Sequence, residues 1–310
     1  IRRGYDKSLA TGSIVAAGCL GILIPPSIML IIYGPMATIS VGKLFMAAFM
    51  PGLLLSALYI VYIGIRCFLN PELGPAIPSS ERMVSFGRKT MLLLTSMAPT
   101  VVLVLAVLGV IFFGIAAPTE AAASGAFVAT LLAIAYRRFN MKVLYGTALA
   151  TLRLTSMILL IGSCAFAFVG IFLSAGCGKV IEELILATPG GRWGAFFVVM
   201  LIIFLLGFFI DWIGILFIIV PIISPLAPAL GFNPLWFAMM ICVNLQTSFM
   251  TPPFAVGIFF LRGSADPKLG ISMADIIRGV IPFVILVLVG LGLCVAFPEI
   301  ILWLPERMIK

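Results

Sequence analysis

The chain has 310 residues, of which 63% are hydrophobic and only 10% are charged. Soluble domains carry about 25% charged residues, so this composition excludes a soluble enzyme or binding domain and indicates a polytopic membrane protein. Its 19 basic and 11 acidic residues give a net charge of +8, and because the basic residues are scattered we expect them in cytoplasmic loops and not against nucleic acid.

Apolar runs of membrane length follow one another along the chain. A helix needs about 20 apolar residues to cross a bilayer. The predicted elements cover residues 8–34, 44–66, 91–115, 118–136, 154–175, 193–230, 235–261 and 280–303. The run at 193–230 is too long for one crossing and contains Gly207, Asp211, Gly214 and Pro221, so it predicts two short helices that meet at a tip. We therefore predict an all-α polytopic membrane protein.

Two of these runs are interrupted by a pair of prolines, at residues 25–26 and 252–253. A proline inside a helix lacks a backbone donor and clashes with the preceding turn, at a cost of about 3 kcal/mol. The first pair begins 19 residues after Asp6 and the second begins 19 residues after Asn233. Both blocks read Gly-aromatic-Asp/Asn, an apolar half, Pro-Pro, a second apolar half and a Ser-led segment closed by proline. This order of features predicts an internal repeat.

The positions of Lys and Arg predict how each block crosses the membrane. The basic loops 66–90 and 137–153 are placed in the cytoplasm, whereas residues 176–192 and the end of the chain are placed outside. Block one begins with Arg2, Arg3 and Lys7 and so starts in the cytoplasm, but the matching segment of block two, "PALGFNPLW", carries no charge and lies outside. The two blocks then cross in opposite directions, as in the inverted-topology repeats of secondary transporters.

The two interruptions are predicted to frame one site near the middle of the bilayer. Each proline removes the N–H that would bond the carbonyl four residues earlier, which releases Gly21 and Ile22 in the first block and Ser248 and Phe249 in the second. A released carbonyl in hydrocarbon needs a partner, and a dehydrated cation is one. The half-helix that begins after each pair offers amide donors and a positive dipole end to an anionic substrate group.

Polar side chains gather at the second interruption, in "NLQTSFMT", whereas the first interruption offers only small residues and a serine. For any single hydroxyl the alternative is a hydrogen bond between helices, but the cluster as a whole predicts a site. The cation-binding candidates are Asp211, Thr251, Ser248, Gly18 and Gly21, and the substrate-binding candidates are Ser27, Pro26, Pro253, Asn244 and Gln246.

Asp211 is the ionisable residue that lies deepest in an apolar run. Such a group is expensive in a membrane and indicates function, either as a Na⁺ ligand or as a proton carrier. The alternative is a structural hydrogen bond to an amide of the broken helix. Hard oxygen ligands without thiolate or imidazole favour Na⁺, which we place at Asp211 and Thr251. Glu120, after Pro118 and Thr119, instead predicts a helix N-terminal cap, with a substrate or gating role as its alternative.

Four segments, "GILIPPSIMLIIYG", "APTEAAASGA", "GFFIDWIGILFIIVPIISPLAPALGFNP" and "NLQTSFMTPPFAVGIFF", resemble in this order the large membrane subunit of tripartite ATP-independent periplasmic (TRAP) transporters. The resemblance covers essentially the whole chain. It implies an elevator-type transporter of the bacterial inner membrane, built from two inverted repeats that each have a re-entrant hairpin and a broken helix. It also implies Na⁺-coupled uptake of organic acids without another cofactor. The implied partners are a periplasmic substrate-binding protein and a small four-helix membrane subunit.

The resemblance also implies how the chain divides and where its cation sites lie. Residues 1–68 would be the remainder of the first repeat, and residues 69–90 a cytoplasmic linker. The second repeat would cover residues 91–303, with a hairpin at about 193–230 and a broken helix at about 234–262. A tail would follow at 304–310. The family's first hairpin would precede the chain, which we therefore expect to be part of a longer protein. Cation sites between hairpin tips and broken helices would use Asp211 with Thr251, and Gly18 to Gly21. Trp212 stands where we expect a small residue or proline.

Other classes of function fit the residues less well. Histidine is absent and the six cysteines lack CxxC spacing, which argues against metal, redox and triad chemistry. An intramembrane aspartyl protease needs two carboxylates in one site, and only Asp211 lies deep in an apolar run. H⁺ coupling through Asp211, a non-transporting scaffold subunit and a passive channel remain as alternatives. We therefore predict a transporter subunit and not an enzyme.

Overall fold

The computed structural model describes residues 1, 3–76 and 85–307, and within these ranges it is helical and without strands. Five of the described helices are long and apolar enough to cross a membrane, and the bent pair of α1 and α2 would make a sixth. The five are α3 (Val41–Leu69), α4 (Phe86–Phe112), α5 (Pro118–Ala135), α6 (Met141–Ser174) and α13 (Met273–Ala296). The predicted all-α polytopic fold class is confirmed, and the elevator motion stays a prediction.

The remaining helices are shorter and include both halves of each interrupted run. They are α1 (Lys7–Leu23), α2 (Ile28–Ala37), α7 (Cys177–Leu186), α8 (Gly191–Leu206), α9 (Trp212–Ile223), α10 (Leu226–Ala229), α11 (Pro234–Leu245), α12 (Val256–Ser264) and α14 (Glu299–Glu306), with 3-10 turns η1 (Pro71–Leu73), η3 (Gln246–Phe249) and η4 (Pro267–Leu269). The span predicted at 280–303 is present as α13, but its bounds differ. That run is divided between α13 and α14, because Pro298 cannot continue the hydrogen bonding of α13.

The chain forms two compact units. The first, called the core unit here, contains residues 1–75 and 160–307, and the second contains residues 76–159. The two units group residues that contact one another, whereas the predicted repeats 1–68 and 91–303 divide the chain by its repeated sequence pattern. The repeats therefore stay a prediction. Residues 77–84 of the predicted linker 69–90 and residues 308–310 of the predicted tail lie outside the described residues.

The second unit pairs α4 with α5. The Ser124 hydroxyl on α5 donates a hydrogen bond to the Ala106 carbonyl on α4 at 2.8 Å. At the start of α5 the Ala117 N–H donates to the Glu120 carboxylate at 3.1 Å, with Pro118 in the first helical position. The prediction that Glu120 caps this helix is therefore confirmed.

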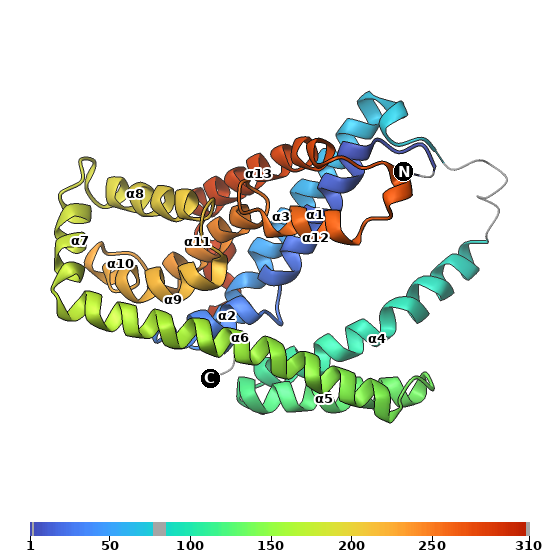
Figure 1. The fold of residues 1–310 in the computed structure, drawn as a ribbon, viewed down its shortest axis with the longest axis horizontal. Coiled ribbons are helices and arrows are strands. Elements are labelled where there is room, and N and C mark those ends of the chain that lie inside the picture. Colours follow the sequence, from blue (N-terminus) through green and yellow to red (C-terminus); the bar gives the residue numbers. More distant parts are fainter. Residues whose placement is uncertain (2, 77–84, 308–310) are drawn as a thin grey trace. The chain divides into compact units, whose positions relative to one another are not determined.

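In the core unit, the contacts of one block have counterparts in the other. The predicted repeat matches α1, α2 and α3 with α11, α12 and α13. α1 packs along α13 as α11 packs along α3, and α1 packs on α3 as α11 packs on α13 (Figure 1). The pairs α2–α3 and α12–α13 match in the same way. Such an exchange of partners is what two copies of one folding unit produce when they pack against each other.

The Gly-aromatic-Asp/Asn motif has the same local structure in both blocks. Gly4 and Gly231 both adopt positive φ, +83° and +72°, a region that glycine enters without steric cost. Asp6 accepts a hydrogen bond from the first turn of α1 at 2.7 Å, and Asn233 accepts one from the first turn of α11 at 2.9 Å. Both residues are therefore N-caps, which satisfy otherwise unpaired amides at the helix start.

α1 and α13 cross with their backbones in direct contact. A Cβ atom added at Gly12 would lie 2.1 Å from the Gly279 carbonyl oxygen, and one added at Gly279 would lie 2.1 Å from the Ser8 carbonyl oxygen. Small residues permit this close approach of helices, which is common in membrane proteins. The crossing joins a helix of block one to a helix of block two.

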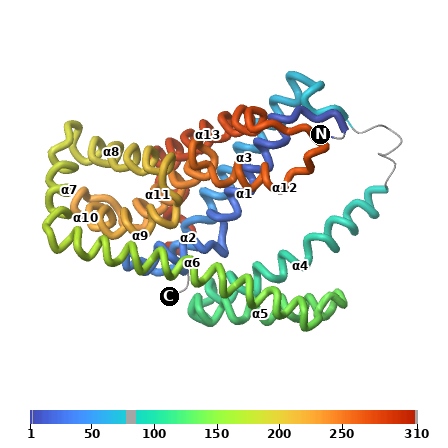
Figure 2. Tube along the Cα trace, viewed as in Figure 1, coloured from blue at the N-terminus to red at the C-terminus, as the bar shows by residue number. Residues whose placement is uncertain are grey.

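The run at 193–230 forms the predicted pair of short helices. α8 and α9 pack against each other and meet at residues 207–211, and the trace continues through α10 into α11 (Figure 2). On its flanks, α8 contacts α11 and α9 contacts α2. Block one and block two thus both contact this hairpin.

Candidate functional site

Three short non-helical or irregular segments of the core unit build the candidate site. They are named here the hairpin tip (residues 207–211), the first break (residues 24–27, between α1 and α2) and the second break (residues 246–255, between α11 and α12). Each break contains a cis peptide bond between its two prolines.

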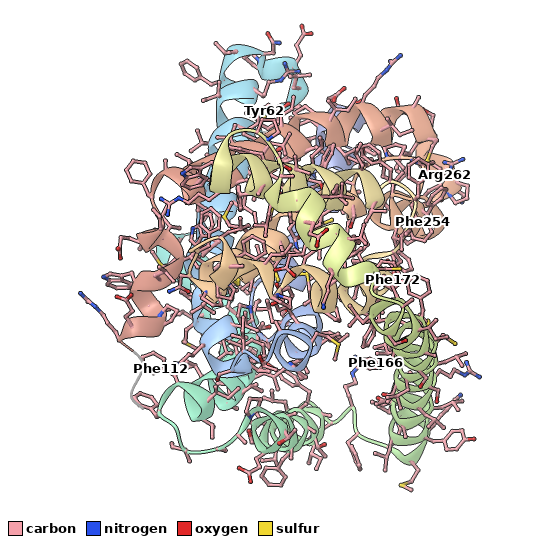
Figure 3. All side chains as sticks on the ribbon, turned by 90° about the vertical axis from the view of Figure 1, so that its left-hand side faces the viewer. Tyr62, Phe112, Phe166, Phe172, Phe254 and Arg262 are labelled. Atoms are coloured by element: carbon pink, nitrogen blue, oxygen red, sulfur yellow. The ribbon has the colours of Figure 1, made fainter. Side chains whose placement is uncertain are left out.

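The hairpin tip packs directly on the second break. The Phe254 N–H donates a hydrogen bond to the Phe208 carbonyl at 3.1 Å. A Cβ atom added at Gly207 would lie 2.7 Å from the Ser248 Cβ, so only glycine permits this contact. Phe254, which precedes α12, and Arg262, in the last turn of α12, lie on the same side of the core unit (Figure 3). We call the contact between tip and break the tip–break junction.

Asp211 lies at this junction as the N-cap residue of α9. Its side chain is half-buried and lies within reach of the Trp212 and Ile213 N–H groups in the first turn of α9, which is the structural role left open as an alternative. Trp212, which follows it, packs on Phe249 of the second break with ring centroids 6.0 Å apart. Asp211 therefore lies in the sequence between two residues that contact the second break, Phe208 through its backbone carbonyl and Trp212 through its ring. The large Trp212 ring fills space against the break.

The hydroxyl groups of the second break are oriented by the backbone. Thr247, Ser248 and Thr251 each donate a hydrogen bond to a carbonyl three or four residues earlier, at 2.7, 2.7 and 2.8 Å. A hydroxyl that has used its hydrogen in this way keeps lone pairs as acceptors. The predicted cation ligands Ser248 and Thr251 thus present oxygen atoms suited to a cation.

The two amides of the cluster differ in their surroundings. Asn244 is 2% exposed and donates a hydrogen bond from its side chain to the Met200 carbonyl at 2.7 Å, which joins α11 to α8. Gln246 is 0% exposed, and neither its side-chain oxygen nor its nitrogen has a hydrogen-bond partner. A buried polar group without a partner requires an explanation such as an ion, a water molecule or a ligand.

Replacing Gln246 with leucine is expected to stabilise the folded chain while impairing transport. Leucine removes a buried amide that has no partner, and such a group costs about 1–3 kcal/mol. The matched control is Asn244→Leu, which breaks the bond to Met200 and is expected to destabilise the chain by a similar amount. Thermal unfolding of the purified complex, compared with its uptake rate, checks both signs. If Gln246→Leu destabilised the chain as much as Asn244→Leu, the Gln246 amide would have a hydrogen-bond partner in the folded chain, which would contradict its unpaired state.

At the first break the structure corrects one expectation. The Ile22 carbonyl, predicted to be open to a cation, accepts a hydrogen bond from the Ser27 hydroxyl. The same oxygen of Ser27 accepts a hydrogen bond from the Leu30 N–H at 3.4 Å, so Ser27 caps α2. Ser27 is 2% exposed, whereas Pro26 is exposed. The first break is therefore partly closed by its own serine.

A cavity of about 360 Å³ connects block one to the tip–break junction. Its walls come from α1 and α12, and it also reaches Trp212 and Phe249. Gly18 lines this cavity, so the structure brings this predicted residue close to the second break. Space is also open around Gly21, where a Cβ atom would meet no neighbour within 4 Å. Pro253 is exposed on the second break.

Some residues of the site were not predicted from the sequence. Phe208 contributes a backbone carbonyl, which any residue could supply, so no side-chain pattern indicates it. Gly257 lies against the released Phe249 carbonyl, with a Cβ position 3.0 Å from that oxygen. The glycine four residues after Pro253 was the available signal for this close approach.

The described residues hold no cluster of three or more His, Cys, Asp or Glu side chains that could bind a metal ion. A cation at the tip–break junction would therefore have one carboxylate, from Asp211, and otherwise neutral oxygens. That donor set suits a monovalent hard cation better than a transition metal, which favours imidazole or thiolate.

The family model described as "Tripartite ATP-independent periplasmic transporter, DctM component" matches residues 1–300. The chain belongs to this family. It is 30% identical, over 99% of its length and 69% of the relative's, to the C4-dicarboxylate TRAP transporter large permease protein DctM of Pseudomonas aeruginosa. The resemblance to TRAP large permeases is confirmed, and the chain is a transporter subunit and not an enzyme.

Two further TRAP relatives are named for other solutes. The sialic acid TRAP transporter permease protein SiaT of Haemophilus influenzae is 28% identical over 99% of this chain and 48% of its own length. The ectoine TRAP transporter large permease protein TeaC of Halomonas elongata is 27% identical over 99% of this chain and 69% of its own length. Because relatives named for three different solutes match almost equally well, the TRAP permease framework is common to them.

Proposed function

We propose that this chain is the transport subunit of a Na⁺-coupled importer of organic acids. In a bacterial inner membrane it would work with a periplasmic substrate-binding protein and a small four-helix membrane subunit. The family assignment supports the tripartite arrangement, and the relatives named for C4-dicarboxylates, sialic acid and ectoine support a polar organic substrate that carries a carboxylate.

The observation that carries the proposal is the tip–break junction. There the hairpin tip that contains Asp211 packs on the second break, whose hydroxyl groups donate to backbone carbonyls and keep lone pairs as acceptors. We propose that Na⁺ binds between Asp211 and Thr251, with the Ser248 oxygen and the carbonyls released by the prolines completing its shell. Gly18 and Gly21 would serve a second cation from the side of block one.

The substrate carboxylate would then bind close to these cations. The first turns of α2 and α12 carry amides that no helical carbonyl can satisfy, and a helix N-terminus favours negative charge. A bound cation beside these amides lowers the cost of placing the anion in a low-dielectric site. Coupling follows because the anion binds well only when the cation is present. Gln246, whose amide has no hydrogen-bond partner, would contribute one polar contact to the substrate or to a water molecule bound to the substrate.

Movement of the site between the two membrane faces would follow the inverted repeat. The core unit contains both breaks and the hairpin, so we propose that it carries the bound solute as one body, in the manner of an elevator. The alternative of a non-transporting scaffold subunit has no use for two matched breaks. Complete absence of binding-protein-dependent uptake by the assembled complex would favour that alternative.

Uptake by the full complex in liposomes is expected to require a Na⁺ gradient. The assay adds the binding protein with its bound organic acid outside the vesicles and compares Na⁺ with K⁺ or choline buffers. Unchanged uptake without Na⁺, together with stimulation by an inward pH gradient, would reject Na⁺ coupling and favour H⁺ coupling through Asp211.

Asp211→Asn is expected to lower coupled uptake at least tenfold without disturbing assembly. Asparagine keeps the size of the side chain but removes the charge that a cation would neutralise. The matched control is Glu120→Gln, since Glu120 serves as a helix cap and glutamine can fill the same capping position. Na⁺-dependent uptake and the yield of assembled complex are measured for both. Uptake by Asp211→Asn at the rate of Glu120→Gln would remove Asp211 from the mechanism.

A further inference from the structure

A long apolar groove lies on the core unit, away from the cavity beside the tip–break junction. Its volume is about 530 Å³. One wall is α8, the other is α13, and α11 forms the floor. Phe197 and Leu201 on α8 and Leu288 on α13 are each about half exposed along it. Asn244 is the one polar residue of its lining, and the Asn244 amide is bonded to the backbone of α8.

The helices that form the groove walls are apolar enough to lie in a membrane. The α13 wall belongs to a helix long and apolar enough to span the bilayer, and the α8 wall belongs to a short apolar helix. An apolar groove exposed to hydrocarbon is filled by whatever hydrocarbon the membrane supplies. A single extended acyl chain can lie along such a groove, whose lining is apolar apart from Asn244.

An arginine and an aromatic cluster stand at one end of this groove. The Arg192 guanidinium lies 5.7 Å from the centroid of the Trp193 ring and 5.6 Å from that of Phe232. Among the described residues no carboxylate pairs with Arg192. Phe196, one turn further along α8, contacts Trp193 and lines the groove. Aromatic and basic side chains at the end of an apolar helix are typical of the membrane–water interface.

We propose that the groove between α8 and α13 binds one acyl chain of a phospholipid whose phosphate pairs with Arg192. The cation–π contacts hold the guanidinium in place, so little side-chain freedom is lost when the phosphate binds. The negative phosphate complements the positive charge of Arg192. Because α8 leads into the hairpin tip, such a lipid would brace the outer side of the hairpin.

The test titrates lipid into the delipidated full transporter complex and measures bound lipid by native mass spectrometry. The probes are a palmitoyl-oleoyl phosphatidylglycerol and the diacylglycerol with the same chains, which lacks the phosphate. We expect the wild-type complex to bind the phospholipid about tenfold more tightly than the diacylglycerol. Arg192→Ala is expected to abolish this preference, whereas the matched charge removal Lys179→Ala on α7 is expected to keep it.

Gly292→Phe tests the groove itself. Space is open around Gly292, where a Cβ atom would meet nothing within 4 Å, so a large side chain can fill the groove without displacing the backbone. This variant is expected to lose binding of both lipids. Ile285→Phe, on an exposed position of α13 that does not line the groove, is the control. Leu201→Trp fills the groove from the α8 side and serves as a second variant should Gly292→Phe fail to assemble.

Three results would overturn the proposal. Equal binding of phospholipid and diacylglycerol by the wild-type complex would show that the phosphate is not recognised. Unchanged lipid binding by both groove-filling variants would place the lipid elsewhere. Crosslinking of a cysteine at position 201 to a helix of the small membrane subunit, with no lipid bound, would make the groove a protein interface.

Discussion

Gly207→Ala is expected to reduce solute uptake about 100-fold while the complex still assembles. The new Cβ would lie 2.7 Å from the Ser248 Cβ, closer than atoms of this kind approach each other, so the hairpin tip must move away from the second break. Displacing a functional group by about 1 Å can cost 100-fold in rate. The movement would separate Asp211 from the hydroxyl oxygens proposed to share a cation with it. Uptake in liposomes and thermal unfolding of the complex are measured together.

A second substitution separates this clash from a general loss of stability. Ser248→Gly removes the atom that the new Cβ would meet and leaves the Ser248 Cα at 3.3 Å. In that background Gly207→Ala is expected to cost little further uptake, which a double-mutant cycle measures. Gly214→Ala, also in the hairpin, would meet only a side-chain methyl of Ile210 and is the control. An equal loss from Gly207→Ala with and without Ser248 would contradict the geometry of the junction.

Gly279→Ala is expected to give one of the largest losses of stability among single-methyl additions in the core unit. The added carbon would lie 2.1 Å from the Ser8 carbonyl oxygen, and both partners are backbone, so no side-chain rotation relieves the overlap. Overpacking of this kind costs about 3 kcal/mol, which corresponds to a fall in Tm of about 5–10 °C. Thermal unfolding of the purified complex in detergent checks this value.

Gly64→Ala is the matched control for the helix crossing. Gly64 lies inside α3, where a Cβ atom would meet nothing within 4 Å. Alanine is favoured over glycine inside a helix by about 0.5–1 kcal/mol, so this variant is expected to unfold at the same or a slightly higher temperature. If Gly279→Ala unfolds at the same temperature as Gly64→Ala, the close contact of α1 with α13 is not correct.

The sequence predicted the parts of the fold that depend on local chemistry. The proline pairs at residues 25–26 and 252–253 placed both breaks, since a proline interrupts helical hydrogen bonding wherever it stands. Asp6 and Asn233, whose equal spacing from these pairs predicts a repeat, are both N-caps, and the repeat itself stays a prediction. Glu120 was recognised as a cap for the same reason. Local rules sufficed because each of these features involves residues within a few positions of one another.

Features that depend on tertiary contacts were missed. The resemblance implied a site between the hairpin tip and the second break, but the contact of Gly207 with Ser248 was missed, because it depends on how α8 packs on α11. The closure of the Ile22 carbonyl by Ser27 depends on the turn that follows the prolines, which the pattern of residue types does not specify. The end of α13 was missed because apolar residues continue beyond it into α14, although Pro298 was an available signal.

The glycine crossing of α1 with α13 limits how this permease can change shape. Two backbones in van der Waals contact cannot slide past each other without first separating, and Gly12 and Gly279 come from opposite blocks. This crossing joins a helix of each block over a backbone-to-backbone contact. We therefore expect the displacement proposed for transport to move both blocks of the core unit together with the bound solute.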